Sequence, residues 1–188
     1  MLKLGTAFLS GWLSRSQKPA LNSTPDKGTA EFREAESQFN LGCRFTSGDG
    51  MAQDSARAAD CYLKAANDGH REAQFNLGLM YERGEGVSRD EVKALLWLRK
   101  SADLGHAGAQ YHLGLWKHRA SLSCPQAEAS ECRIEAFKWL QLAMAQGCRG
   151  SESARDSVAL AMTWEEVHEG GRRAATFAAA AAKPGSEC

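Results

Sequence analysis

The sequence predicts an all-α fold in which pairs of antiparallel helices stack into a solenoid. The first observation is an internal repeat, because residues 73–87 have counterparts 36 positions earlier and 36 positions later. The second is that the other half of the unit repeats as well, at 58–66, 94–102 and 136–143. Periods between about 20 and 50 residues are typical of stacked supersecondary units. The connections within each unit are short, which makes the two helices antiparallel neighbours.

Residues 1–16 predict a short amphipathic helix, because their large apolar residues recur at helical spacing between Lys3 and Arg15. Those residues are Leu4, Phe8, Leu9, Trp12 and Leu13. We expect this helix to pack on the first repeat or to fray. A helix on a membrane surface is an alternative, since the segment is cationic. A signal peptide would need a longer apolar stretch and a small-residue cleavage site. Residues 17–29 are rich in turn-forming residues and predict a flexible linker.

Residues 30–148 predict three repeats of two helices each. The repeats are 35–70, 71–106 and 107–148. In the first helix of the second repeat, Ala73, Leu77 and Tyr81 share one face. A glycine on that face recurs in every copy, although glycine costs roughly 1 kcal/mol relative to alanine inside a helix. These glycines are Gly42, Gly78 and Gly114. We therefore expect a partner helix to pass too close for a Cβ.

The turn and the second helix of each repeat also have recognisable signals. Gly84 and Gly86 are expected to end the first helix, because glycine tolerates the left-handed conformation of a helix terminus. Asp54 and Asp90 lie where the N-cap of the second helix should be. That helix is expected to face its partner with small residues alternating with a large one. The small residues are Ala58, Ala94 and Ala136, and the large ones are Trp97 and Trp139.

The third repeat contains six additional residues, because the spacing from Ala94 to Ala136 is 42 instead of 36. The turn glycines are missing from residues 120–130. An insertion in a solenoid is expected in a loop on one edge. Pro125 also disfavours a continuous helix through this region. We therefore predict a loop over residues 120–130.

Residues 149–180 predict a pair of capping helices, which repeat arrays need in order to cover the last apolar face. The first of them is expected over residues 153–162. Its inward residues are expected to be Ala154, Val158, Leu160 and Ala161. Thr163 and Glu166 match a capping box at the start of the second helix. Residues 181–188 predict a disordered tail.

The balance of 23 basic and 23 acidic residues argues against a nucleic-acid partner, which requires a basic surface. No run approaches the 18 or so apolar residues of a spanning helix, so we expect a soluble, cytoplasmic monomer. Cys43 and Cys61 occupy core positions of the repeat. Cys124 and Cys132 lie close together in the insertion. We expect them to be reduced thiols in a reducing compartment, with a disulfide as the alternative.

Residues 73–106, with their Leu-Gly, Gly-x-Gly-Val, Ala-x-x-Trp and Gly-His elements, resemble a Sel-1-like repeat. The resemblance covers about residues 35–148, and the 36-residue spacing distinguishes it from tetratricopeptide repeats. It implies a right-handed α-solenoid that acts as a non-enzymatic adaptor and holds a protein or peptide in a concave groove, without a cofactor. A cysteine-rich branch of the family is associated with penicillin binding or β-lactamase activity, so a hydrolase is the alternative function. The bridging cysteines of that branch would fall at Ala66 and Gln74 and at Ala102 and Gln110, which are not cysteines here.

By analogy with tetratricopeptide stacks, the first helices are expected to line the concave face. The candidate partner-binding residues are Phe39, Cys43, Thr46, Phe75, Leu79, Glu82, Tyr111, Leu115 and His118. They would form an apolar ladder with a polar edge, which suits an extended or helical peptide. The alternative is that Phe75 and Leu79 belong to the core between repeats.

The sequence contains neither a Gly-x-Ser-x-Gly elbow nor a Ser-x-x-Lys motif, so it lacks the serine acyl-transfer signatures. His70 and His106 follow the glycine that closes each second helix, and we expect them at structural positions on surface connectors. A metal site would have to combine His112, His118, Cys124 and Cys132. Their spacing fits no zinc pattern, and no metal site is predicted.

Overall fold

The computed structural model describes residues 27–181, and these form eight helices joined by short turns. In chain order they are α1 (Lys27–Ser47), α2 (Ser55–Asn67), α3 (Arg71–Arg83), α4 (Glu91–Asp103), α5 (Ala107–Ser123), α6 (Gln126–Ala145), α7 (Ser151–Ala159) and α8 (Trp164–Ala181). The helix predicted over 1–16, most of the predicted linker and the tail after 181 lie outside the described residues. The last three residues of the predicted linker, 27–29, already belong to α1.

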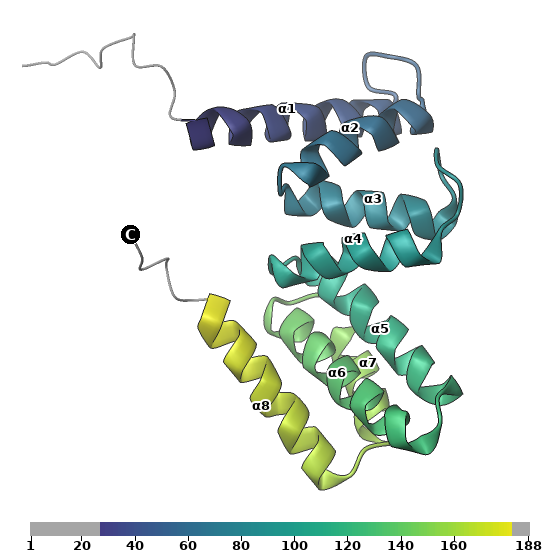
Figure 1. Cartoon of the computed structure of the whole chain (residues 1–188), viewed down its shortest axis with the longest axis vertical. Helices are drawn as coiled ribbons and strands as arrows, with labels where there is room; N and C mark the ends of the chain where they lie inside the picture. Colours follow the sequence, from purple (N-terminus) through teal and green to yellow (C-terminus); the bar gives the residue numbers. More distant parts are fainter. Residues whose placement is uncertain (1–26, 182–188) are drawn as a thin grey trace, which may run out of the picture.

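From α1 to α7, consecutive helices run antiparallel and lie side by side, so that these residues form a stack of helix pairs (Figure 1). The repeats correspond to α1 with α2, α3 with α4, and α5 with α6, while α7 and α8 both pack on α6. The predicted all-α solenoid of three repeats with a C-terminal cap is therefore confirmed. No helix among residues 27–181 combines the length and the hydropathy needed to cross a membrane.

Aspartates and glycines define the helix ends at the positions that the sequence predicted. The carboxylates of Asp54 and Asp90 each accept a backbone N–H in the first turn of α2 and α4, both at 3.0 Å. Gly84 ends α3 with a φ of 74°, in the left-handed region that glycine enters without a steric penalty. These contacts satisfy backbone groups that a helix leaves without partners at its ends.

The glycines inside the first helices lie where the second helix of the same repeat packs against them. A Cβ at Gly78 would lie 2.9 Å from Leu98 Cγ and 3.3 Å from the carbonyl oxygen of Ala94. At Gly42 it would lie 2.7 Å from Tyr62 Cε1. Such distances are shorter than a side chain tolerates in a close-packed interior. The expected close approach of paired helices is therefore present, and it depends on these glycines.

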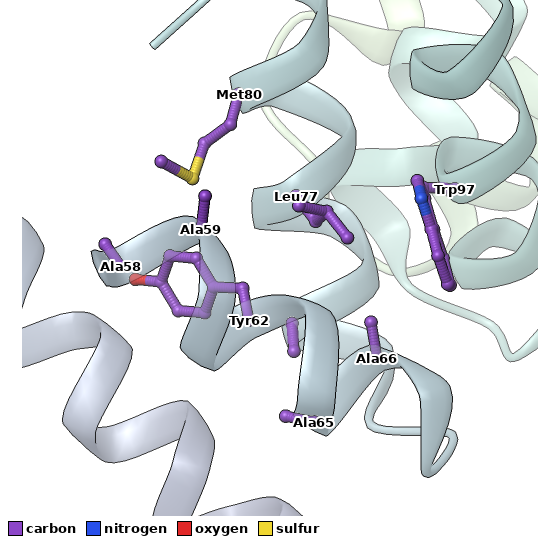
Figure 2. Close-up of a cluster of buried hydrophobic side chains, with 9 residues drawn as sticks. Ala58, Ala59, Tyr62, Ala65, Ala66, Leu77, Met80 and Trp97 are labelled. Carbon is purple, nitrogen blue, oxygen red and sulfur yellow. The ribbon is translucent and has the colours of Figure 1, made fainter. Parts of the chain in front are cut away.

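The core alternates small and large apolar residues across the stacked helices. In the first cluster, Tyr62, Leu77, Met80 and Trp97 surround the buried alanines of α2 (Figure 2). Ala58 is one of these alanines, and further buried positions of the repeat signature are Ala94, Ala136 and Trp139. A second cluster joins α4, α5, α6 and α8, so that apolar burial continues from one repeat to the next. Such contacts between neighbouring units are what stabilise a repeat protein.

Two buried glutamines connect the second helix of one repeat to the first helix of the next. Gln74 Nε2 donates to the carbonyl oxygen of Ala66 at 3.0 Å, and Gln110 Nε2 donates to that of Ala102 at 3.2 Å. Gln110 Oε1 also accepts a hydrogen bond from Gln146 Nε2 at 2.8 Å. The same pairs of positions would carry disulfides in the cysteine-rich branch that the sequence resembles less well. In this chain, hydrogen bonds connect the helices there.

The six additional residues of the third repeat do not form the predicted loop. The turn between α5 and α6 is also shorter than that between α3 and α4, and the residues gained in this way join the six additional ones in lengthening both helices. Helix α5 has 17 residues and α6 has 20, compared with 13 each in α3 and α4. Pro125 is compatible with this arrangement because it occupies the N-cap of α6, where its missing N–H is not needed. Ser121 and Ala129 in the extended turns are buried, so the longer helices add contacts that a loop would not make.

The C-terminal helices cap the stack, with one difference from the prediction. The capping box is confirmed, because the Glu166 N–H donates to Thr163 Oγ1 at 3.3 Å and the Thr163 N–H donates to Glu166 Oε2 at 2.9 Å. Val158 is fully buried in the third cluster. Leu160 is 91% exposed and Ala161 is exposed as well, so their predicted inward position is wrong. The reason is that α7 ends at residue 159, and the chain then turns away from the buried face.

Candidate protein-binding surface

Two histidines that were predicted on surface connectors instead cap helices and stack on aromatic rings. The Nδ1 atoms of His70 and His106 each accept the backbone N–H three residues later, at 3.2 and 3.1 Å. Their rings stack on Phe39 and Phe75, respectively, with centroids 4.4 Å apart in both pairs. His70 is only 9% exposed, so a surface position is wrong for it. Each histidine thus joins the first helix of one repeat to that of the next.

We expect the stability of the stack to fall between pH 7 and pH 5 through His106. Burial lowers the pKa of this imidazole below its usual 6.5, and the nearby Glu72 offsets the effect only in part. The unfolded chain therefore binds a proton that the folded chain excludes. Stability that is fully present above about pH 6.5 is then lost as the pH falls through the folded-state pKa. The cap also requires an unprotonated Nδ1.

A His106→Asn variant should lose less stability than the wild type between pH 7 and pH 5, because asparagine caps a helix without titrating. At pH 7 the variant should be less stable by about 1 kcal/mol, since the stacking on Phe75 is lost. Burial also lowers the pKa of His112, so the wild type and the variant both lose some stability in acid through this second histidine. Urea denaturation followed by circular dichroism measures both effects. An equal loss in the two proteins would contradict the assignment to His106.

The predicted groove residues lie in several different environments. Phe75 and Leu79 pack against the second hydrophobic cluster, and Tyr111 packs against the third. Three further residues of the set are half-buried on α3 and α5: Glu82, Leu115 and His118. Phe39 lines a pocket near the start of α1, whereas Glu82 lines a different, smaller cleft. Phe75 and Leu79 therefore contribute to packing between repeats.

A pocket of about 510 Å³ opens beside the N-terminal half of α1, and we call it the N-terminal pocket. This half of α1 projects past α2 (Figure 1). The other walls are the α2–α3 turn and the end of α4. Its apolar lining includes Phe32, Ala35, Phe39 and Leu104. Phe32 is 67% exposed and Leu104 is 50% exposed, so two large apolar side chains face solvent next to a concavity. Neither residue could be predicted from the sequence, because the pocket forms only where turns that are distant along the chain meet α1.

Carboxylates outnumber cations around the N-terminal pocket. Its charged lining consists of Glu36, Asp68, Glu72 and Arg71. Glu36 Oε2 lies 3.0 Å from His70 Nε2, which fixes this carboxylate beside the ring. Burial disfavours the Glu72 carboxylate, but the hydrogen bond and charge of Arg71 outweigh burial and lower the pKa of Glu72. Glu72 is therefore ionised at neutral pH, and the excess negative charge favours a basic ligand.

A smaller cleft lies between α3, α4 and α5 and has a volume of about 40 Å³. His112 Nδ1 lies 3.8 Å from Glu82 Oε2 at its edge. Leu95 and Trp116 supply apolar lining. Ligand pockets typically measure about 300–1,000 Å³, so this cleft is too small to hold more than one side chain. The N-terminal pocket falls within that range.

The cysteines of the insertion are free thiols rather than a disulfide. Burial, followed by the neighbouring Cys132, raises the pKa of the Cys124 thiol. A raised pKa keeps a thiol protonated and weakly nucleophilic at neutral pH. Within residues 27–181, no three His, Cys, Asp or Glu side chains gather as a group that could hold a metal ion. His112, His118, Cys124 and Cys132 therefore do not converge.

The family model described as Sel1 repeat matches the chain three times, at residues 35–70, 71–106 and 107–148. The chain belongs to the Sel1 repeat family. The first matched segment contains residues 35–47 of α1 and the whole of α2, the second contains α3 and α4, and the third contains α5 and α6. Proteins of this family are commonly scaffolds for protein interactions. No curated protein matches the chain.

Two solved structures share the arrangement of these Sel1 repeats. A protective antigen of uropathogenic Escherichia coli with an SLR fold is 25% identical, with a TM-score of 0.64, and the match covers 85% of this chain. A Sel1 repeat protein from Oxalobacter formigenes is 27% identical, with a TM-score of 0.57, over 84% of this chain. The matches cover 35% and 60% of those two proteins, so the chain spans only part of their length.

Proposed function

We propose that this Sel1 repeat protein is a non-enzymatic adaptor and that the N-terminal pocket is where it anchors a partner protein. The observation that supports this site is the exposure of Phe32 and Leu104 at the edge of a 510 Å³ concavity. Burying a large apolar side chain contributes about 1.5–3 kcal/mol. Residues that dominate binding energy typically lie in such pockets, surrounded by polar groups that exclude water.

The lining of the pocket indicates the chemistry of the partner segment. An apolar side chain of the partner would enter between Phe32, Phe39 and Leu104. Basic residues flanking that side chain would face Glu36 and Glu72. An amphipathic helix or an extended peptide with one apolar anchor and basic neighbours satisfies both requirements. The charge complementarity would also accelerate association at low ionic strength.

The test is an affinity pull-down from the organism that makes the protein, quantified by mass spectrometry. The full chain is compared with the variant Phe32→Ser/Leu104→Ser, in which both substituted side chains are exposed and removable without a cavity. The matched control is Leu122→Ser/Leu160→Ser, because these leucines are 74% and 91% exposed on other parts of the stack. We expect the pocket variant to retain the partner about tenfold less well than the control. Equal capture by both variants would contradict the proposed site.

Substitution of Phe75 and Leu79 is a poorer test of binding. Both side chains pack against the second hydrophobic cluster, so their removal weakens the contact between repeats. A partner lost by such a variant could reflect reduced stability alone. Because Phe32 and Leu104 are exposed, substituting them tests binding without weakening the fold.

A further inference from the structure

The N-terminal pocket lies next to the point at which the N-terminal segment enters α1. Helix α1 begins at Lys27, and Phe32 is five residues further on, which is about 7.5 Å along a helix. Twenty-six residues precede Lys27. Residues 17–26, a ten-residue stretch, have a root-mean-square span of about 17 Å if they behave as a flexible linker. The distance from Lys27 to Phe39 along α1 is about 18 Å, so residues 4–13 are within reach of the α1 wall of the pocket.

The composition of this segment matches the pocket. Residues 4–13 carry five large apolar side chains at helical spacing. Residues 1–25 contain Lys3, Arg15 and Lys18 and no acidic residue. The pocket offers the opposite charge, because three carboxylates and one guanidinium line it together with its apolar side chains. A basic amphipathic helix is therefore the type of ligand that this surface favours.

We propose that residues 4–13 dock in the N-terminal pocket of the same chain and compete there with the partner. Tethering places the segment at an effective concentration in the millimolar range, so even a weak contact is well populated. A partner must then displace the segment before it reaches Phe32 and Leu104. The competition rests on the proposed function, whereas the docking of the segment does not.

The docking is tested by photo-cross-linking in the full chain, with benzoylphenylalanine in place of Trp12. We expect cross-links within one molecule to residues 32–39, 68–72 or 104. The Phe32→Ser/Leu104→Ser background should reduce their yield about tenfold, and the Leu122→Ser/Leu160→Ser background should not. Cross-links that scatter over α5 to α8 would overturn the proposal. Covalent dimers whose yield rises with protein concentration would instead assign the pocket to a second copy.

A second measurement uses a fluorescent synthetic peptide of residues 1–16 as the probe. It should bind the full-chain variant Leu9→Glu/Trp12→Glu at least about tenfold more tightly than the wild type, whose own segment occupies the pocket. Equal affinities would overturn the docking. Preferential cross-linking of position 12 to lipid in vesicles of phosphatidylcholine and phosphatidylserine would overturn it in favour of a membrane-surface helix.

The two proposals fail in different ways. Cross-links to the pocket without a partner that depends on Phe32 and Leu104 would contradict the adaptor site and leave the docking supported. A partner that depends on those residues, together with cross-links elsewhere, would support the adaptor site and overturn the docking.

Discussion

Replacing Gly114 with valine is expected to lower the free energy of unfolding by about 3 kcal/mol. A Cβ at this position would lie 2.6 Å from Leu140 Cγ and 3.3 Å from the carbonyl oxygen of Ala136. Leu140 is completely buried, and a close-packed interior leaves a side chain little room to move aside. The carbonyl oxygen belongs to the backbone of α6, so relief would require the two helices of the third repeat to separate. Chemical denaturation monitored by circular dichroism measures the loss.

The control for this substitution is Gly171→Ala in α8. No heavy atom lies within 4 Å of a Cβ at Gly171, and the residue is inside a helix. Alanine should therefore raise the free energy of unfolding by up to about 1 kcal/mol, because glycine is the poorer helix former. The free energy of unfolding is therefore expected to fall for Gly114→Val and to rise for Gly171→Ala. A Gly114→Val variant as stable as the wild type would contradict the close approach of α5 and α6.

Replacing Glu166 with alanine should also cost about 3 kcal/mol, because it removes three contacts at once. Arg133 Nη2 donates to Glu166 Oε1 at 2.7 Å, and Ser130 Oγ donates to the same oxygen. The third contact is the reciprocal hydrogen bond with Thr163 in the capping box. The side chains of Arg133 and Glu166 are only 16% and 10% exposed, so the variant leaves a cation poorly solvated.

The matched control is Glu165→Ala, since Glu165 is the exposed neighbour in the same first turn of α8. A change of less than about 0.5 kcal/mol is expected there. Equal losses for Glu165→Ala and Glu166→Ala would show that the network between α6 and α8 does not stabilise the cap.

The contribution of Glu166 should disappear in acid. Burial disfavours its carboxylate, but the hydrogen bonds from Arg133 and Ser130 outweigh burial and lower the pKa from 4.5 to about 2. Between these values the unfolded chain binds a proton that the folded chain does not. The stabilisation is therefore fully present above about pH 4.5 and is lost as the pH falls towards 2. The difference in stability between wild type and Glu166→Ala should shrink over the same range.

The features that the sequence predicted correctly are those that local chemistry decides. Asp54 and Asp90 are caps because a helix start needs an acceptor for its free N–H groups. Thr163 and Glu166 satisfy each other within four residues. Gly78 was recognisable because a glycine that recurs inside a helix indicates a close neighbour. Each of these signals can be read without knowing the rest of the fold.

The features that the sequence did not predict depend on residues that are distant along the chain. The insertion at residues 120–130 extends α5 and α6, because these two helices pack against each other and the added turns continue that packing. The absence of turn glycines had indicated a loop instead. The N-terminal pocket combines Phe32, which precedes the first repeat, with Leu104 at the end of the second. His70 follows a glycine that suggests a connector, yet its neighbours Phe39 and Glu36 bury it. None of these partners could be assigned from spacing alone.

Hydrogen exchange of the full chain carrying Leu9→Glu/Trp12→Glu, whose own N-terminal segment does not occupy the pocket, alone and with the protein captured in the pull-down, tests the adaptor site most directly. We expect the partner to slow exchange in the first half of α1, residues 30–39, and in the α2–α3 turn, residues 68–72. The Phe32→Ser/Leu104→Ser variant should lose this protection, and the Leu122→Ser/Leu160→Ser control should keep it. Protection that is instead confined to the end of α5 and the start of α6, with α1 unchanged, would contradict the N-terminal pocket as the binding site.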